Sequence, residues 1–383
     1  MKGTARIIST YTSDISGVCS ALYELGGMTV IHDASGCNST YTTHDEPRWY
    51  DMDSMIYISG LTETEAIFGD DGKLVGDIVN TAGELSPRFI AICSSPVAMM
   101  AGTDFQAIAA EVEDKSGIPA FGMHTNGMHS YLSGASEAFG TVAENFCRAD
   151  ATGSGELSVN IIGATPLDFS VNSSVESIRR WLADSGFEVV SCMAMGSSID
   201  EISMAGRARV NLVISYSGMA AARVLRKKFG TPYVAGVPIG RKFADILAAD
   251  LRRAAENGEN SAPCARRGNT DAGGISVVGE SVFAGSLARA VKEESGRSAR
   301  MLCPLDTSDE LMADGDIPIP DEDDAAEAFA EAGGVIADPL YKPICPKDVP
   351  FYSLPHEAFS GRCYRKSIPN LINGDLKLWE RRI

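Results

Sequence analysis

Positive charge is scarce in this sequence: 33 lysines and arginines stand against 51 aspartates and glutamates, for a formal net charge of −18. A chain this acidic repels a phosphate backbone, and no basic stripe offsets the charge, so we expect no nucleic-acid partner. The sequence also lacks an apolar run of membrane-spanning length and the apolar core of a secretory signal. We therefore expect a cytoplasmic protein with no membrane partner.

Compact cysteine motifs are missing too. None of the nine cysteines shows the C-x-x-C spacing of ferredoxins or zinc ribbons. In the reducing cytoplasm these thiols would stay mostly unpaired, so disulfides are not expected. Thiolate chemistry or simple burial must explain them.

Short apolar runs rich in β-branched residues alternate with stretches of helical apolar spacing. The expected strands are Met28–Ile31, Phe89–Cys93, Val159–Ile162, Val189–Val190, Val210–Ile214, Tyr233–Val237, Ile275–Val278 and Val335–Ala337. The expected helices are Ser16–Leu25, Asp104–Lys115, Val175–Ser185, Ala220–Phe229, Ala244–Ala255, Ala284–Glu294 and Ala325–Ala332. Such alternation predicts right-handed βαβ crossovers and open parallel sheets.

The alternating pattern restarts after two polar connectors, residues 149–156 and 258–274. Glycine-rich, polar stretches of this kind are typical of linkers. We therefore predict an α/β protein with three doubly wound parallel-sheet domains, covering residues 1–150, 157–270 and 271–383. The cysteines of interest fall in the first of them.

Three cysteines of the first domain occupy similar places. Cys19 lies near the start of the first helix, Cys37 follows a buried strand, and Cys93 ends another. Carboxyl ends of parallel strands meet at one edge of a sheet, and helix N-termini there favour a thiolate. The residues alone leave two interpretations open, because free cysteines are also among the most buried residue types. The other six cysteines are interpreted as packing or incidental.

Several segments, in order along the chain, carry a family resemblance. They are Cys19, the Ser35-Gly36-Cys37 turn, Cys93, and residues 62–74, 159–163, 208–215, 228–233 and 351–361. Together they resemble the component 1 family of nitrogenase, which includes protochlorophyllide reductases, the F430-synthesis reductive cyclase and the cofactor-assembly scaffold. The resemblance implies three Rossmann-like domains around a central cleft.

The resemblance also implies an oxygen-sensitive iron–sulfur cluster held by Cys19, Cys37 and Cys93. The cluster would be a [4Fe-4S] cluster or a larger, P-cluster-like one shared between subunits. Three thiolates cannot complete four-cysteine ligation. The missing ligand would be an oxygen ligand such as Asp33 or Asp14, or would come from a partner across a two-fold axis.

In function, the resemblance implies a catalytic component that receives electrons from a transient, ATP-dependent iron protein and reduces a small molecule in the interdomain cleft. The chain would form a homodimer, or a heterodimer or heterotetramer with a sister subunit. His129 and His356 are the candidate proton donors.

One departure from nitrogenase bears on the substrate. Ser215 stands where nitrogenase has its cofactor cysteine, and serine is a poor ligand for iron–sulfide sites, so dinitrogen reduction is not expected. Two other functions stay open. One is an assembly scaffold for a cluster or cofactor, without turnover. The other is a non-redox, small-molecule-binding α/β protein.

Overall fold

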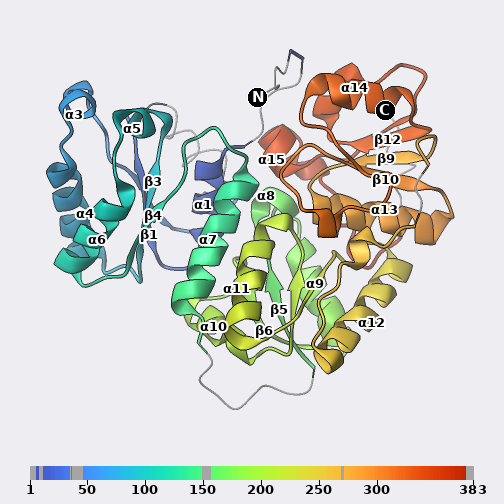
Figure 1. The fold of residues 1–383 in the computed structure, drawn as a ribbon, viewed down its shortest axis with the longest axis horizontal. Coiled ribbons are helices and arrows are strands. Elements are labelled where there is room, and N and C mark those ends of the chain that lie inside the picture. Colours follow the sequence, from blue (N-terminus) through green and yellow to red (C-terminus); the bar gives the residue numbers. More distant parts are fainter. Residues whose placement is uncertain are drawn as a thin grey trace.

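In the computed structural model, residues 6–7, 12–34, 36, 46–148, 157–268 and 271–376 are described. Their strands form three sheets in which every pairing between strands is parallel (Figure 1). This confirms the predicted α/β class. The apolar, β-branched runs lie in these strands because a parallel sheet is covered on both faces and buries both sets of side chains.

The first sheet has the strand order β2-β1-β3-β4. Its strands are β1 (Met28–His32), β2 (Met55–Ile58), β3 (Ile90–Ser94) and β4 (Ala120–Met123). The helices around it are α1 (Asp14–Leu22), α3 (Glu63–Phe68), α4 (Asp71–Leu85), α5 (Pro96–Ala101), α6 (Phe105–Ser116) and α7 (Tyr131–Phe146). Helices α4 and α6 cover the outer face, and α1 and α7 cover the face turned toward the rest of the molecule (Figure 1).

The second sheet has the order β6-β5-β7-β8 and the third the order β11-β10-β9-β12-β13. The second contains β5 (Ser158–Ile162), β6 (Glu188–Met193), β7 (Val210–Val213) and β8 (Tyr233–Ala235), with α8 (Pro166–Phe169), α9 (Ser174–Asp184), α10 (Ile199–Ser203), α11 (Met219–Phe229) and α12 (Arg241–Asn257). The third contains β9 (Ile275–Val278), β10 (Ala299–Cys303), β11 (Ile317–Pro318), β12 (Gly334–Ala337) and β13 (Phe351–Ser353), with α13 (Ser281–Ser295), α14 (Glu322–Ala330) and α15 (Glu357–Ser360).

Helix α7 joins the first sheet to the second, since it packs against both α1 and α11 (Figure 1). The largest buried apolar cluster accordingly runs through all three sheets and includes Ile31, Ile161 and Val277. The predicted domain limits remain a prediction, and the linker 149–156 lies outside the described residues. Among the described helices, each is too short or too polar to cross a membrane.

The contact between α1 and α7 depends on two glycines. A Cβ added at Gly17 would lie 2.0 Å from the carbonyl oxygen of Tyr131, and one added at Gly134 would lie 1.9 Å from that of Asp14. Real Cβ atoms do not approach backbone so closely. The helix that carries Cys19 is therefore held directly against the backbone of α7.

Candidate functional site

The structure brings together two of the three predicted cluster cysteines. Cys93 lies in β3 and pairs with Ile31 of β1, while Cys19 lies in the middle of α1 on the same face of the sheet. The two thiols are fully buried and form a hydrogen bond to each other. Cys37 lies outside the described residues.

The state of these thiols differs from the sequence-based prediction. A helix N-terminus was expected to favour the thiolate, but the pKa of Cys93 is raised well above its ordinary value. The main cause is the hydrogen bond with Cys19, followed by burial. Two buried thiols in contact cannot both ionise without a neighbouring cation, and a bound metal reverses this balance. The donor set thus fits a soft, positively charged iron site.

The described residues supply only part of a metal site. Within them, no group of three or more histidine, cysteine or acidic side chains converges in a metal-binding arrangement. Asp33 directly follows β1 and is buried at the carboxyl end of that strand. A complete site therefore needs Cys37 or a partner subunit in addition to the buried pair.

Asp14, the other candidate oxygen ligand, has a structural role in this arrangement. Its carboxylate is 1% exposed and accepts hydrogen bonds from the backbone N–H groups of Ile15, Asn126 and Gly127 at 2.8–3.0 Å. The same carboxylate lies 3.5 Å from Nδ1 of His129, whose side chain is 58% exposed. Asp14 therefore fixes the loop before α7 to the start of α1, and His129 points outward from that loop.

The cleft between the second and third sheets contains His356. Its Nε2 lies 3.6 Å from Oδ1 of Asp168, and that oxygen accepts a 2.5 Å hydrogen bond from the hydroxyl of Tyr131. Both ring nitrogens of His356 are buried and make no hydrogen bond with any described residue. The backbone N–H of His356 donates to Asp338 at 2.7 Å. The cleft thus collects groups from the first, second and third units.

Glu280 is a second buried carboxyl in this cleft. It accepts hydrogen bonds from the backbone N–H groups of Tyr216, Val282 and Phe283 at 2.5–3.0 Å. Burial, followed by the charge of Asp168, raises the pKa of Glu280 to about 8. Those N–H donors act in the opposite direction, yet burial dominates.

Little open space remains in the cleft. The cavity beside His356 measures about 30 Å³, and its lining includes the returning chain segment 368–372. At about 30 Å³ per water in the liquid, this holds about one water molecule. The predicted substrate location therefore has almost no free volume in this arrangement.

Ser215 acts as part of a turn. Its Oγ lies 3.0 Å from the Oγ of Ser217 and accepts the backbone N–H of that residue at 3.3 Å. Ser215 is fully buried, and a Cβ added at Gly163 would lie 3.1 Å from its carbonyl oxygen. These contacts use the hydroxyl locally, so the residues here do not fit a metal–sulfur cofactor held at this position.

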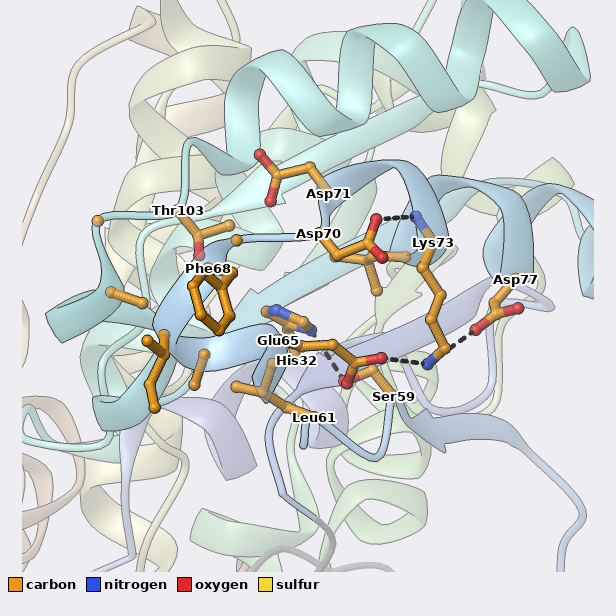
Figure 2. A pocket seen from close by; sticks show the side chains of 16 residues that line it. His32, Ser59, Leu61, Glu65, Phe68, Asp70, Asp71, Lys73, Asp77 and Thr103 are labelled. Carbon is orange, nitrogen blue, oxygen red and sulfur yellow. Dashed lines mark hydrogen bonds and ion pairs between the residues drawn. The ribbon is translucent and has the colours of Figure 1, made fainter. Parts of the chain in front are cut away.

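A larger cavity, of about 200 Å³, opens at the carboxyl end of β1 (Figure 2). His32, the last residue of that strand, lines it together with Ser59, Phe68 and the start of α4. The Nδ1 of His32 lies 2.8 Å from the Oγ of Ser59, and burial lowers the pKa of His32. On the rim, Lys73 pairs with Glu65 at 2.8 Å.

The family described as Nitrogenase component 1 type Oxidoreductase matches residues 15–271, more than half of the 383-residue chain. The chain belongs to this family. The match begins in α1 and ends after α12, so it covers both the buried cysteine pair and the second sheet. It confirms the resemblance drawn from the sequence.

Relatives in this nitrogenase component 1 family match parts of the chain. The nitrogenase iron-molybdenum cofactor biosynthesis protein NifE of Clostridium pasteurianum is 27% identical over 46% of this chain and 38% of its own length. One subunit of the light-independent protochlorophyllide reductase of Prosthecochloris aestuarii is 40% identical over 24% and 18%, respectively. The nitrogenase molybdenum-iron protein alpha chain of Methanosarcina barkeri is 24% identical over 51% and 36%.

In each of these three pairs, the matched part spans less than half of the relative's length. The solved structure of nitrogenase Cp1 at pH 6.5 aligns with a TM-score of 0.59 over 80% of this chain and 64% of that chain. The sequence identity is 16%, so this likeness shows a shared fold. It agrees with the three all-parallel sheets.

Sequence reasoning missed the residues that surround His356 in this family member. Tyr131, Asp168 and Glu280 belong to three different units and drew no attention as sequence motifs. A signal was available for Glu280, because a glutamate directly after the strand Ile275–Val278 and its glycine stands where a helix N-cap is expected. Nothing comparable marked Tyr131 as a partner of Asp168.

Proposed function

We propose that this chain is the catalytic component of a nitrogenase-like iron–sulfur oxidoreductase. Family membership supports the class of protein, and the buried contact between Cys19 and Cys93 carries the assignment of the site. These residues are distant in sequence, and the fold gives two soft ligands one common place. Cys37 is the third proposed ligand, with Asp33 or a partner subunit completing the set.

A cluster bound here would accept and release single electrons, which is the chemistry that such groups supply. The chain's own residues would set its environment. Cys19 and Cys93 would bind as thiolates and give up their protons, and the apolar core around them would exclude water. Asp14 would keep the start of α1 in place through its three backbone N–H contacts.

The proposed partners are a second subunit and an ATP-dependent iron protein. Support comes from an apolar rim that we define as Ile67, Phe68, Val97, Met99 and Met100, on the adjacent helices α3 and α5. The exposed fractions reach 82% for Phe68 and 75% for Met100. Both helices follow strands of the first sheet, so the rim lies at the same edge as the cysteine pair. Exposed apolar patches of this kind mark protein interfaces.

A scaffold that binds a cluster and passes it on is the second candidate. The observation that favours it is the likeness to NifE, a cofactor biosynthesis protein, over part of this chain. The two functions differ in outcome: the reductase turns over a substrate with ATP and the iron protein, and the scaffold transfers its cluster without turnover. Dinitrogen reduction is not expected for either, given Ser215.

The test is anaerobic purification followed by analysis of iron and acid-labile sulfide. Cys19→Ala, Cys37→Ala and Cys93→Ala should each lose most of both. Cys264→Ala is the matched control, because Cys264 is equally buried but lies in a turn after the second sheet. It should keep the wild-type content.

Two results would contradict the proposal. One is a wild-type protein without iron, which favours the non-redox interpretation. The other is an iron content that none of the three variants changes. If iron is present, incubation with an apo acceptor, compared with turnover in the presence of an iron protein and ATP, separates the scaffold from the reductase.

A further inference from the structure

The two cavities near functional residues differ in size enough to decide which can hold a ligand. The His356 cavity measures about 30 Å³ and the His32 cavity about 200 Å³. At about 30 Å³ per water, these volumes correspond to about one and about six water molecules. Of the two, the His32 cavity is the one that admits a small organic molecule without rearrangement.

The His32 cavity and the cysteine pair lie on opposite faces of the same strand ends. His32 pairs with Ser94 in the sheet, one residue beyond the pair formed by Ile31 and Cys93. The Cys93 side chain faces α1, whereas the His32 ring contacts Phe105 of α6. Because packed layers in proteins are about 10 Å apart, a ligand in this cavity lies on the order of 10 Å from the thiols.

The His32 ring is held in one orientation. Its residue is 8% exposed, and Nδ1 lies 2.8 Å from the Oγ of Ser59. That hydroxyl also accepts the backbone N–H of Asp33 at 3.2 Å and reaches the carbonyl of Asp33 at 3.5 Å. All three contacts are satisfied when Nδ1 carries the proton. The Nε2 is then a hydrogen-bond acceptor, with no partner among the described residues, inside the cavity shown in Figure 2.

The charge of the lining is negative. Among the described residues, it contains the carboxylates of Glu65, Asp70, Asp71 and Asp77 and one cation, Lys73. Lys73 is already paired, at 2.8 Å with Glu65 and at 3.6 Å with Asp77. An anion would therefore meet uncompensated negative charge, whereas a cation would be attracted. Phe68 adds an aromatic side chain that can cover a planar cation.

We propose that the His32 cavity binds a small planar cation with N–H donors, of the amidinium class. One N–H donates to Nε2 of His32, and the positive charge lies near Asp71. The cavity is then the substrate pocket of the enzyme, a role that rests on the proposed function. Binding itself does not, because the described lining contains no cysteine.

Binding can be read on the histidine ring signals in NMR spectra of the full chain, since it contains five histidines and His32→Gln assigns the relevant one. The probe is acetamidinium, and acetate is its isosteric anion. Acetamidinium should shift the His32 signal in a saturable way. Acetate should bind at least about tenfold more weakly, because the lining is negative.

Two variants of α4 sharpen the test. Asp71→Asn should weaken acetamidinium binding about two- to fivefold, the range of an exposed ion pair. Glu84→Gln, at the far end of the same helix, should leave it unchanged. Equal binding of acetate, a shift of His356 in place of His32, or a response that does not saturate would overturn the proposal.

Iron analysis of the same preparation keeps the two proposals apart. Acetamidinium binding to a chain without iron would preserve the pocket and refute the redox function. Iron bound through the cysteines, with no acetamidinium binding, would refute the pocket alone.

Discussion

Gly134→Ala tests the packing that holds the cysteine helix in place. The added methyl would lie 1.9 Å from the carbonyl oxygen of Asp14, against the 3.4 Å or more of ordinary contact. The methyl cannot turn away because both neighbours are backbone, so α1 has to move away from α7 by roughly 1 Å or more to restore an ordinary contact. Overpacking of this kind costs about 1–3 kcal/mol.

Gly140→Ala is the matched control on the same helix. Its added Cβ would meet the Cβ of Ala220 at 3.5 Å, an ordinary contact. Replacing glycine by alanine inside a helix without strain gains about 0.5–1 kcal/mol. The two variants should therefore differ by about 2–4 kcal/mol in the free energy of unfolding, with opposite signs relative to wild type.

Urea unfolding followed by far-UV circular dichroism measures this difference. With a slope of about 3 kcal/mol per molar urea, the midpoint of Gly134→Ala should fall by about 0.3–1 M. Because Cys19 moves with α1, the same variant should also retain less iron. A midpoint for Gly134→Ala equal to or above that of Gly140→Ala would refute the close backbone contact between α1 and α7.

Two other predictions concern the cleft and the apolar rim. Glu280 has its pKa raised from 4.5 to about 8, so unfolding releases its proton between these values and its contribution to stability is lost as the pH rises through that range. Asp168→Asn removes the charge that helps raise this pKa, so the decline should end at a lower pH; unchanged urea midpoints across the range would contradict this. Met100→Glu should leave the free energy of unfolding within about 0.5 kcal/mol of wild type, since the side chain is 75% exposed. It should raise the apparent KM for the iron protein, whereas Leu85→Glu, at the opposite end of the first unit, should not; equal effects would argue against the rim as an interface.

The architecture was largely predictable, and the failures have local causes. Helices α4 and α7 were missed, and each contains internal glycines, such as Gly76 and Gly140, that weaken helical propensity. Packing against the first sheet and against α1 and α11 compensates for them. Strands β2 and β4 were missed as well, because they are four residues long and one contains Gly122.

The sequence by itself determined that the chain forms parallel sheets and that two cysteines reach the same part of the first one. Both follow from local pattern, since apolar runs become strands and strand ends share an edge. Tertiary structure alone decided that Tyr131, Asp168 and His356 meet, and that His32 rather than His356 faces an open cavity. Such contacts depend on how separate units pack, and no local spacing encodes the distance between side chains from different sheets.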